Sequence, residues 1–252
     1  MSSLESKIVL ITGASSGIGK SAVAQFAKEG AKLILCARRI DRLKELAAEI
    51  ETETYLIELD LRDRKSVEKV IANLPAEWQA IDILVNNAGL GRGLEKLHEG
   101  NIDGWEEMID TNVKGLLYMS RSIIPGMVTR NSGHIINVGS IAGHEVYPNG
   151  NVYCATKHAV DALTKGMRLD LVDTPLRVST VDPGLVETEF SDVRFYGDFD
   201  RARTVYQGYK ALEAVDVADT IVWIASRPAH VQVAEVVIFP TDQGSAMVTN
   251  KV

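Results

Sequence analysis

The chain alternates short apolar runs with longer amphipathic segments. The apolar runs are rich in β-branched residues and are continuous, which is typical of strands buried on both faces of a sheet. They occupy residues 7–13, 32–38, 54–60, 81–89, 134–140, 176–184 and 234–240. The segments between them predict helices, among them 20–29, 41–51, 105–128 and 152–172, and Pro125 is expected to kink or shorten the third of these.

The repeated order of strand and helix predicts the α/β class, as a Rossmann-type doubly wound parallel sheet of about seven strands with helices on both faces. No linker, repeat or low-complexity tract divides residues 1–252, so a single domain is expected. Residues 186–208 are polar and aromatic without a regular period, and they predict a substrate loop. Ligands bind such sheets at the carboxyl ends of the strands, where most of the chemically suggestive residues fall.

Composition and charge narrow the class of protein further. Charged residues make up 24% of the chain and hydrophobic residues 46%, as in soluble globular proteins. The net charge is −7 and no Lys/Arg run exceeds two residues, which argues against nucleic-acid or membrane partners. Cys36 and Cys154 form no disulfide framework, and neither they nor the five histidines have a metal-ligand spacing. We therefore expect a cytoplasmic protein with a small-molecule partner and no metal.

A glycine-rich turn, TGASSGIGKS, follows the first apolar run. Gly13, Gly17 and Gly19 allow a tight turn in which a pyrophosphate approaches backbone N–H groups at a helix start. Residues 14–21 also match a relaxed P-loop, in which Lys20 would reach a β- or γ-phosphate, although that motif has glycine where Ala14 stands. Taken alone, the turn favours a dinucleotide over a triphosphate and leaves both open.

The end of the second apolar run bears on which dinucleotide is bound. An NAD-specific fold usually carries an acid there, which bonds the ribose 2′-hydroxyl. Here Ala37 takes that place and is followed by Arg38 and Arg39. Guanidinium groups pair with phosphate, so these residues favour NADP(H) over NAD(H). Two arginines exposed on a turn are the alternative.

The stretch GNVYCATKHAVDAL places Tyr153 and Lys157 four residues apart. On a helix they would share one face, one turn apart. An ammonium beside a phenol stabilises the phenolate and lowers the pKa of the tyrosine toward neutrality, as an acid–base catalyst requires. The spacing alone does not separate this device from a pair of surface neighbours.

Six motifs taken together resemble the short-chain dehydrogenase/reductases, in that family's order and over nearly the whole chain: TGASSGIG, NNAG, IDTNVKG, NVGS, YCATK and DPGLVET. The resemblance implies that Tyr153 is the general acid/base and that Lys157 lowers its pKa while bonding the nicotinamide ribose. It implies that Ser140 bonds the substrate oxygen and that Asn112 holds a water of a proton relay.

The same resemblance implies a cofactor site that runs along the strand ends. Its expected members are Gly13, Ser15, Ser16, Gly17, Ile18, Gly19, Arg38, Arg39, Asp60, Leu61, Asn87, Ala88, Gly89, Tyr153, Lys157, Pro183, Gly184, Val186 and Thr188. The C-terminal IFPTDQGSAMV departs from the family's usual ending, so we assign it no cofactor role, and contact with another subunit is its alternative role. His144 and Tyr147, just after Ser140, are further candidates for substrate contact.

Within the family, LPAEW, IDILVNNAGL, MIDTNVKGLLYM and TEFSDVRFYGD resemble the NADP-dependent 3-hydroxy acid dehydrogenases. That resemblance implies oxidation of serine, allo-threonine or 3-hydroxybutyrate-type acids, and a homotetramer or dimer. The substrate site would comprise Ser140, Tyr153 and Arg194, with Arg194 holding the carboxylate; a structural salt bridge is its alternative role. A 3-oxoacyl thioester reductase and a non-catalytic NADP(H) sensor remain alternative functions.

Overall fold

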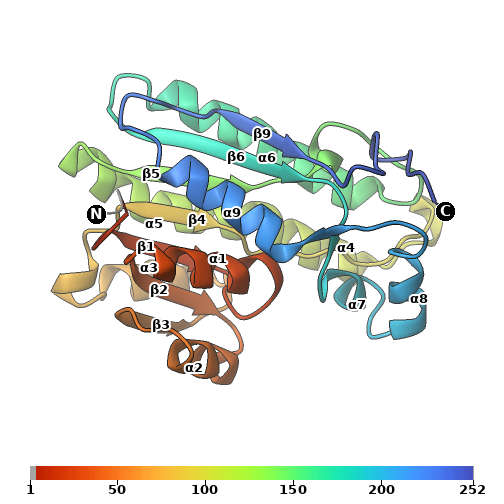
Figure 1. Ribbon diagram of the computed structural model, residues 1–252, viewed down its shortest axis with the longest axis horizontal. Helices are drawn as coiled ribbons and strands as arrows, with labels where there is room; N and C mark the ends of the chain where they lie inside the picture. The colour runs from red at the N-terminus through yellow and green to blue at the C-terminus, as the bar shows by residue number, and fades with distance from the viewer. Residues whose placement is uncertain (1–3, 252) are drawn as a thin grey trace.

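A computed structural model describes residues 4–251. Its main feature is a seven-stranded parallel sheet in the order β3-β2-β1-β4-β5-β6-β9 (Figure 1). The strands are β1 (Ile8–Thr12), β2 (Lys32–Ala37), β3 (Thr54–Glu58), β4 (Ile83–Asn86), β5 (His134–Val138), β6 (Arg177–Pro183) and β9 (Glu235–Ile238). The order reverses between β1 and β4, which creates the crevice where doubly wound sheets bind ligands. The predicted fold is confirmed.

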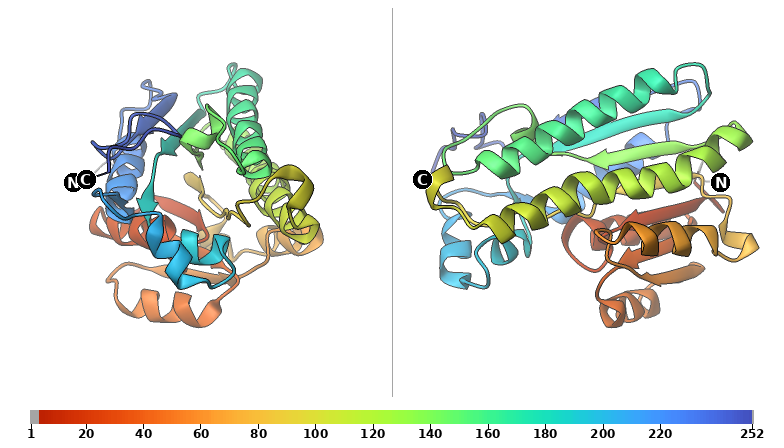
Figure 2. Two further views of the ribbon diagram at one scale, coloured as in Figure 1. Left: turned by 90° about the vertical axis from the view of Figure 1, so that its right-hand side faces the viewer. Right: turned by 180° about the vertical axis from the view of Figure 1, so that it is seen from behind.

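Helices cover both faces of the sheet (Figures 1 and 2). One face carries α1 (Gly17–Lys28), α2 (Ile40–Ala48) and α9 (Ala214–Ala225), and the other carries α3 (Arg64–Ala72), α5 (Leu116–Arg130) and α6 (Asn151–Asp170). Phe26 and Ile221 are fully buried in the first layer, as Val67 and Met119 are in the second. Burial of these apolar faces is the main stabilising force. None of the helices between residues 4 and 251 combines the length and apolarity that a membrane crossing needs.

The helix predicted over residues 105–128 is longer and less uniform than expected. It consists of α4 (Ile102–Ile109), a π-helical turn (Asp110–Gly115) and α5. The expectation that Pro125 shortens it is wrong, because α5 continues to Arg130. Proline removes one backbone donor, but buried Ile123 and Met127 on either side keep this part of α5 packed against the sheet.

The sequence predicts an irregular loop over residues 186–208, but the structure shows that this substrate segment contains regular elements. These elements are β7 (Val186–Glu187), α7 (Phe190–Arg194) and α8 (Phe199–Thr204), beyond the carboxyl ends of the strands (Figure 1). Strand β7 pairs in parallel with β8 (Leu212–Glu213). Asp198 caps α8 by accepting a hydrogen bond from the backbone of Arg201. Helices this short hold little more than one turn, so no apolar period marks them in the sequence.

Candidate active site

A cavity of about 520 Å³ opens at the carboxyl ends of the strands. It brings together all but two of the predicted site residues, from the glycine turn after β1 to Arg194 of the substrate segment. Gly19 and Asn112 are the exceptions. A Cβ at Gly19 would clash with the carbonyl oxygen of Gly13, so glycine at this position allows α1 to approach the turn closely.

The glycine turn is fastened to the end of β4. Gly13 and Gly17 have φ values of +66° and +52°, which favour glycine. Asn87 Nδ2 donates to the carbonyl oxygen of Thr12 at 2.9 Å, and a Cβ at Gly13 would lie 2.9 Å from Ala88 Cα. The turn therefore lies at the N-terminus of α1, where backbone N–H groups can bind a pyrophosphate.

Lys20 does not support the P-loop alternative. Its Nζ lies 3.8 Å from a carboxylate oxygen of Glu49, and Lys20 does not line the cavity. A P-loop lysine reaches the terminal phosphates instead. The turn thus suits a pyrophosphate bound by backbone groups.

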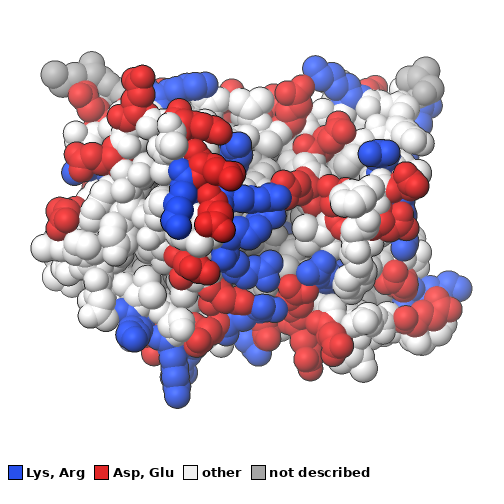
Figure 3. Space-filling model, turned by 90° about the horizontal axis from the view of Figure 1, so that it is seen from below, with Lys and Arg blue, Asp and Glu red and all other residues white. Residues whose placement is uncertain are grey.

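The two arginines after β2 lie at one end of the cavity. Arg39 Nη2 donates to Ser16 Oγ at 2.9 Å and to Ser15 Oγ at 3.2 Å. Arg38 is half-exposed and forms an ion pair of 3.6 Å with Glu107. Figure 3 shows basic and acidic side chains interleaved rather than a single-signed surface. These guanidinium groups are therefore suited to a local phosphate at the cavity edge.

Helix α6 carries Tyr153 and Lys157, and both side chains line the cavity. The Tyr153 ring meets Phe190 edge to face, with 5.5 Å between centroids. Lys157 Nζ donates to the Val138 carbonyl oxygen at 2.9 Å and lies 6.0 Å from the Tyr153 ring centroid. Burial lowers the pKa of Lys157 to about 8, against the opposing attraction of Asp182. This lysine can therefore change its charge near neutral pH.

The pKa of the Tyr153 phenol is shifted in the direction opposite to the one expected. Burial raises its pKa above the ordinary tyrosine value, and nearby Tyr147 raises it further. The positive charge of Arg194 and the Ser140 hydroxyl act in the opposite direction. The chain's own groups therefore do not lower the pKa of Tyr153 overall, because desolvation outweighs the nearby cation.

Ser140 and Asn112 differ in their access to the cavity. Ser140 lines the cavity, and its Oγ accepts a hydrogen bond from the backbone of Ala142 at 3.1 Å. Buried Asn112, in the π-helical turn, accepts from Leu90 N and donates to Leu90 O, both at 2.9 Å. Asn112 also donates to Thr156 on α6. It thus ties the segment after β4 to the helix that carries the Tyr–Lys pair, and the water relay stays a prediction.

Arg194 projects from α7 onto the Tyr153 ring. Its guanidinium carbon lies 4.7 Å from the ring centroid of Tyr153 and 4.9 Å from that of Phe190. Its Nη2 donates to Tyr147 Oη at 3.0 Å, whereas its buried Nε has no hydrogen-bond partner within residues 4–251. No acid in that part of the chain forms an ion pair with Arg194, so the salt-bridge alternative is wrong there.

Several residues line the cavity that the sequence analysis did not name, among them Glu189 and Phe190 within the predicted substrate loop and Gln243 and Ala246 of the C-terminal tail. Gln243 Oε1 accepts a hydrogen bond from Leu185 N at 2.8 Å, so the C-terminal tail lies against the segment after β6. The sequence assigns this tail no cofactor role, whereas the structure places Gln243 and Ala246 at the cavity. Tyr147 lines the cavity as anticipated, whereas His144 does not. No local pattern marks Gln243 and Ala246, because tertiary packing brings them to the cavity.

This geometry agrees with the comparisons to known proteins. Residues 7–196 match the family model described as short chain dehydrogenase, and the chain belongs to that family. The NADP-dependent 3-hydroxy acid dehydrogenase of Escherichia coli is 48% identical over 240 residues, which cover 95% of this chain and 97% of that protein. Its namesake from Schizosaccharomyces pombe is 46% identical over 251 residues, 98% of this chain and 97% of that protein. A solved closed form of serine dehydrogenase complexed with NADP+ has a TM-score of 0.93 and 47% identity, over 97% of this chain and 99% of that one.

Proposed function

We propose that the protein is an NADP(H)-dependent oxidoreductase that oxidises the 3-hydroxyl group of short 3-hydroxy acids, such as serine, allo-threonine or 3-hydroxybutyrate, or reduces the matching carbonyl. The family and the names of its relatives support the class and the cofactor. The position of Arg194 is the observation that supports an acid as the substrate. Arg194 is a cation without a carboxylate partner within residues 4–251, and it lies against the ring of the candidate acid/base, Tyr153.

The residues around the cavity fit NADP(H). The turn at Gly13 and the start of α1 would bind the pyrophosphate, and Arg38 and Arg39 the 2′-phosphate. Asp60 and Leu61 would bind the adenine, Asn87, Ala88 and Gly89 the adenosine ribose, and Pro183, Gly184, Val186 and Thr188 the nicotinamide amide. The bound cofactor accepts or gives the hydride, and its oxidised ring adds a positive charge that favours the phenolate of Tyr153.

The proposed reaction requires two groups that hold the substrate and one general base. Arg194 would bind the carboxylate bidentately, and Ser140 Oγ would bond the oxygen on C3. During oxidation Tyr153 would take the hydroxyl proton while the C–O bond becomes C=O, and bound NADP+ would supply the acceptor for the hydride from C3. Lys157 would bond the nicotinamide ribose and supply positive charge near the phenolate. Reduction runs the same steps in reverse.

The test is to follow NADPH formation with serine, allo-threonine, 3-hydroxybutyrate and a neutral secondary alcohol of similar size, each with NADP+ and with NAD+. We expect turnover of the acids with NADP+ and little turnover of the neutral alcohol. Turnover of the neutral alcohol alone would leave the dehydrogenase chemistry intact and contradict the acid substrate. Turnover with NAD+ alone would contradict the cofactor.

We also propose a homotetramer or dimer in the cytoplasm. Large apolar residues are exposed on the long helices, with Ile102 64% and Leu169 74% exposed, and a partner subunit would bury them. Cys36 and Cys154 are free and buried, which suits a reducing compartment. Light scattering measures the mass in solution, and a monomer at micromolar concentration would contradict the assembly.

A further inference from the structure

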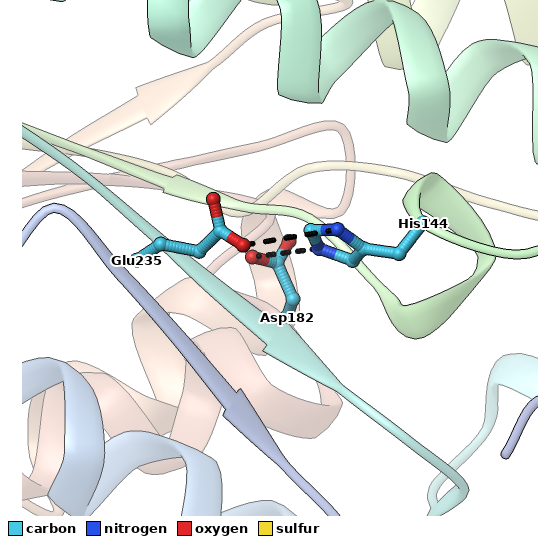
Figure 4. Close-up of side chains that lie close together, drawn as sticks. All are labelled: His144, Asp182 and Glu235. Atoms are coloured by element: carbon cyan, nitrogen blue, oxygen red, sulfur yellow. Dashed lines mark ion pairs between the residues drawn. The ribbon is translucent and has the colours of Figure 1, made fainter.

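Three titratable side chains meet outside the cavity, close to Ser140 (Figure 4). They are His144 from the loop after β5, Asp182 from β6 and Glu235 from β9. His144 Nε2 lies 3.3 Å from Asp182 Oδ2, and His144 Nδ1 lies 3.7 Å from Glu235 Oε1. The side chain of Asp182 is only 2% exposed, so its charge depends on these neighbours.

Asp182 is linked to two residues of the Tyr–Lys site. Its Oδ1 accepts hydrogen bonds from Ser140 N at 3.1 Å and from Thr180 Oγ1 at 3.0 Å. Its negative charge also attracts the ammonium of Lys157. Glycine at position 139 permits this close approach, because a Cβ at Gly139 would clash with Asp182 Oδ1. One buried carboxylate therefore contacts the backbone of the serine and stabilises the charge of the lysine.

The cluster has the residue types of a cation site, but its geometry favours an ion-pair bridge, in which His144 Nε2 and Asp182 Oδ2 make no hydrogen bond within residues 4–251. The two ring nitrogens of His144 face different carboxylates, whereas a metal ion bonds only one nitrogen of a histidine. Lys165 Nζ also lies 3.9 Å from Glu235 and supplies positive charge there. An imidazole between two carboxylates compensates the charge of Asp182 without an ion.

We propose that Asp182, supported by His144, is a positioning residue of the active site that fixes the backbone of Ser140 and places a stabilising negative charge behind the ammonium of Lys157. This inference rests on the proposed chemistry of Tyr153 and Lys157. The carboxylate acts through those residues and touches neither substrate nor cofactor.

The charges around the cluster set the direction of its pH response. His144 faces Asp182 and Glu235, and Glu235 in turn faces Lys165, which pairs with Asp161 on α6. Burial raises the pKa of Asp182, His144 lowers it, and Glu235 raises it. Loss of His144 and loss of Glu235 should therefore move the titration of Asp182 in opposite directions.

The first test compares Asp182→Asn with Thr180→Val. Thr180→Val removes one hydrogen bond to Oδ1 and leaves the charge, whereas Asp182→Asn removes the charge and keeps an oxygen that can accept. The pKa of Lys157 is measured by NMR of protein labelled with ¹³C-lysine, with Lys157→Arg used to assign the signal. We expect its value of about 8 to fall by about one pH unit in Asp182→Asn and to stay constant in Thr180→Val. In Asp182→Asn the alkaline limb of the pH–rate profile for carbonyl reduction should move to lower pH as the pKa of Lys157 falls.

An unchanged Lys157 titration in folded Asp182→Asn would overturn the inference. This readout needs neither substrate nor cofactor, so it is independent of whether the proposed function holds. In the second test, His144→Ala should move the acid limb of turnover to higher pH, and Glu235→Gln should not. Stoichiometric binding of zinc that His144→Ala abolishes would also overturn the inference, because Asp182 would then belong to a metal site.

Discussion

Arg39 Nη2 lies 2.9 Å from Ser16 Oγ, so the arginine that follows β2 is tied to the glycine turn that follows β1. The same guanidinium reaches Glu189 of the substrate segment at 3.2 Å. The hydrogen bonds to Ser15 and Ser16 reduce the freedom of the arginine before a ligand arrives. A side chain ordered in advance binds a phosphate at lower entropic cost.

Arg39→Ala should therefore weaken the binding of NADP+ selectively. Loss of a charge-assisted contact to phosphate of about 1.5–3 kcal/mol corresponds to a rise of about 10–100-fold in the KM for NADP+. The KM for NAD+ should stay within about twofold, because NAD+ lacks the 2′-phosphate. Steady-state kinetics with both cofactors measures the ratio. Arg42→Ala is the matched control, since Arg42 contacts Glu189 at 2.8 Å but makes no hydrogen bond to the glycine turn.

Arg38→Asp tests the other arginine at this edge. Arg38 pairs with Glu107 and still lines the cavity. A carboxylate there would repel the 2′-phosphate and could accept a hydrogen bond from a 2′-hydroxyl, so the preference should move toward NAD(H). An unchanged cofactor ratio would show that the 2′-phosphate is held elsewhere.

Arg194→Ala should raise the KM for acid substrates much more than the KM for neutral substrates. The variant loses the cation beside Tyr153, so the KM for 3-hydroxy acids should rise about 10–100-fold while that for a neutral alcohol changes little. Arg194→Lys should recover part of the loss as a point charge without bidentate geometry. Arg201→Ala is the control, because Arg201 stacks on Phe195 at 4.3 Å in the same segment and does not line the cavity. Equal losses for acids and alcohols would argue for a packing role.

Tyr153→Phe should keep NADPH binding and lose turnover by about 10²–10⁴-fold, the range expected for general acid–base catalysis. Fluorescence titration measures the binding, and single-turnover kinetics measures the chemistry. Tyr147→Phe is the comparison, because Tyr147 bonds Arg194 and should mainly affect KM. Near-normal turnover in Tyr153→Phe would contradict the proposed base.

The sequence predicted those parts of the site that each depend on one local pattern. The apolar runs located all seven strands of the sheet, and the residues after them fell in one cavity because parallel strands end at a common edge. The spacing of Tyr153 and Lys157 correctly placed both on α6. Their pKa values were less predictable, because burial depends on the whole fold and here outweighs the nearby charge at Tyr153.

Other parts of the site have no local pattern. Gln243 reaches the cavity because the tail after β9 folds back onto Leu185, 58 positions earlier in the chain. The cluster of His144, Asp182 and Glu235 joins three separate elements through side-chain contacts alone. Such contacts depend on the register of β6 and β9, in which Asp182 pairs with Val237. Periodicity predicts the strands but not this register.

Lys157→Met should make the protein more stable while removing its activity. Lys157 is 7% exposed, and its pKa of about 8 lies below the ordinary lysine value of 10.5. Between these values the unfolded chain binds more protons than the folded chain, so this group makes stability rise with pH. Below pH 8 the buried ammonium costs up to about 3 kcal/mol, which methionine does not incur.

The stability advantage of Lys157→Met should therefore be largest near pH 7 and shrink by about 2 kcal/mol near pH 9.5, where the wild-type lysine is mostly neutral in the folded state. Urea unfolding at both pH values measures the difference. Lys165→Met is the control on the same helix, because Lys165 is half-exposed and pairs with Asp161 at 2.7 Å. A stability difference between Lys157→Met and wild type that stays constant with pH would show that Lys157 titrates alike in the folded and unfolded chains, and that burial does not set its charge.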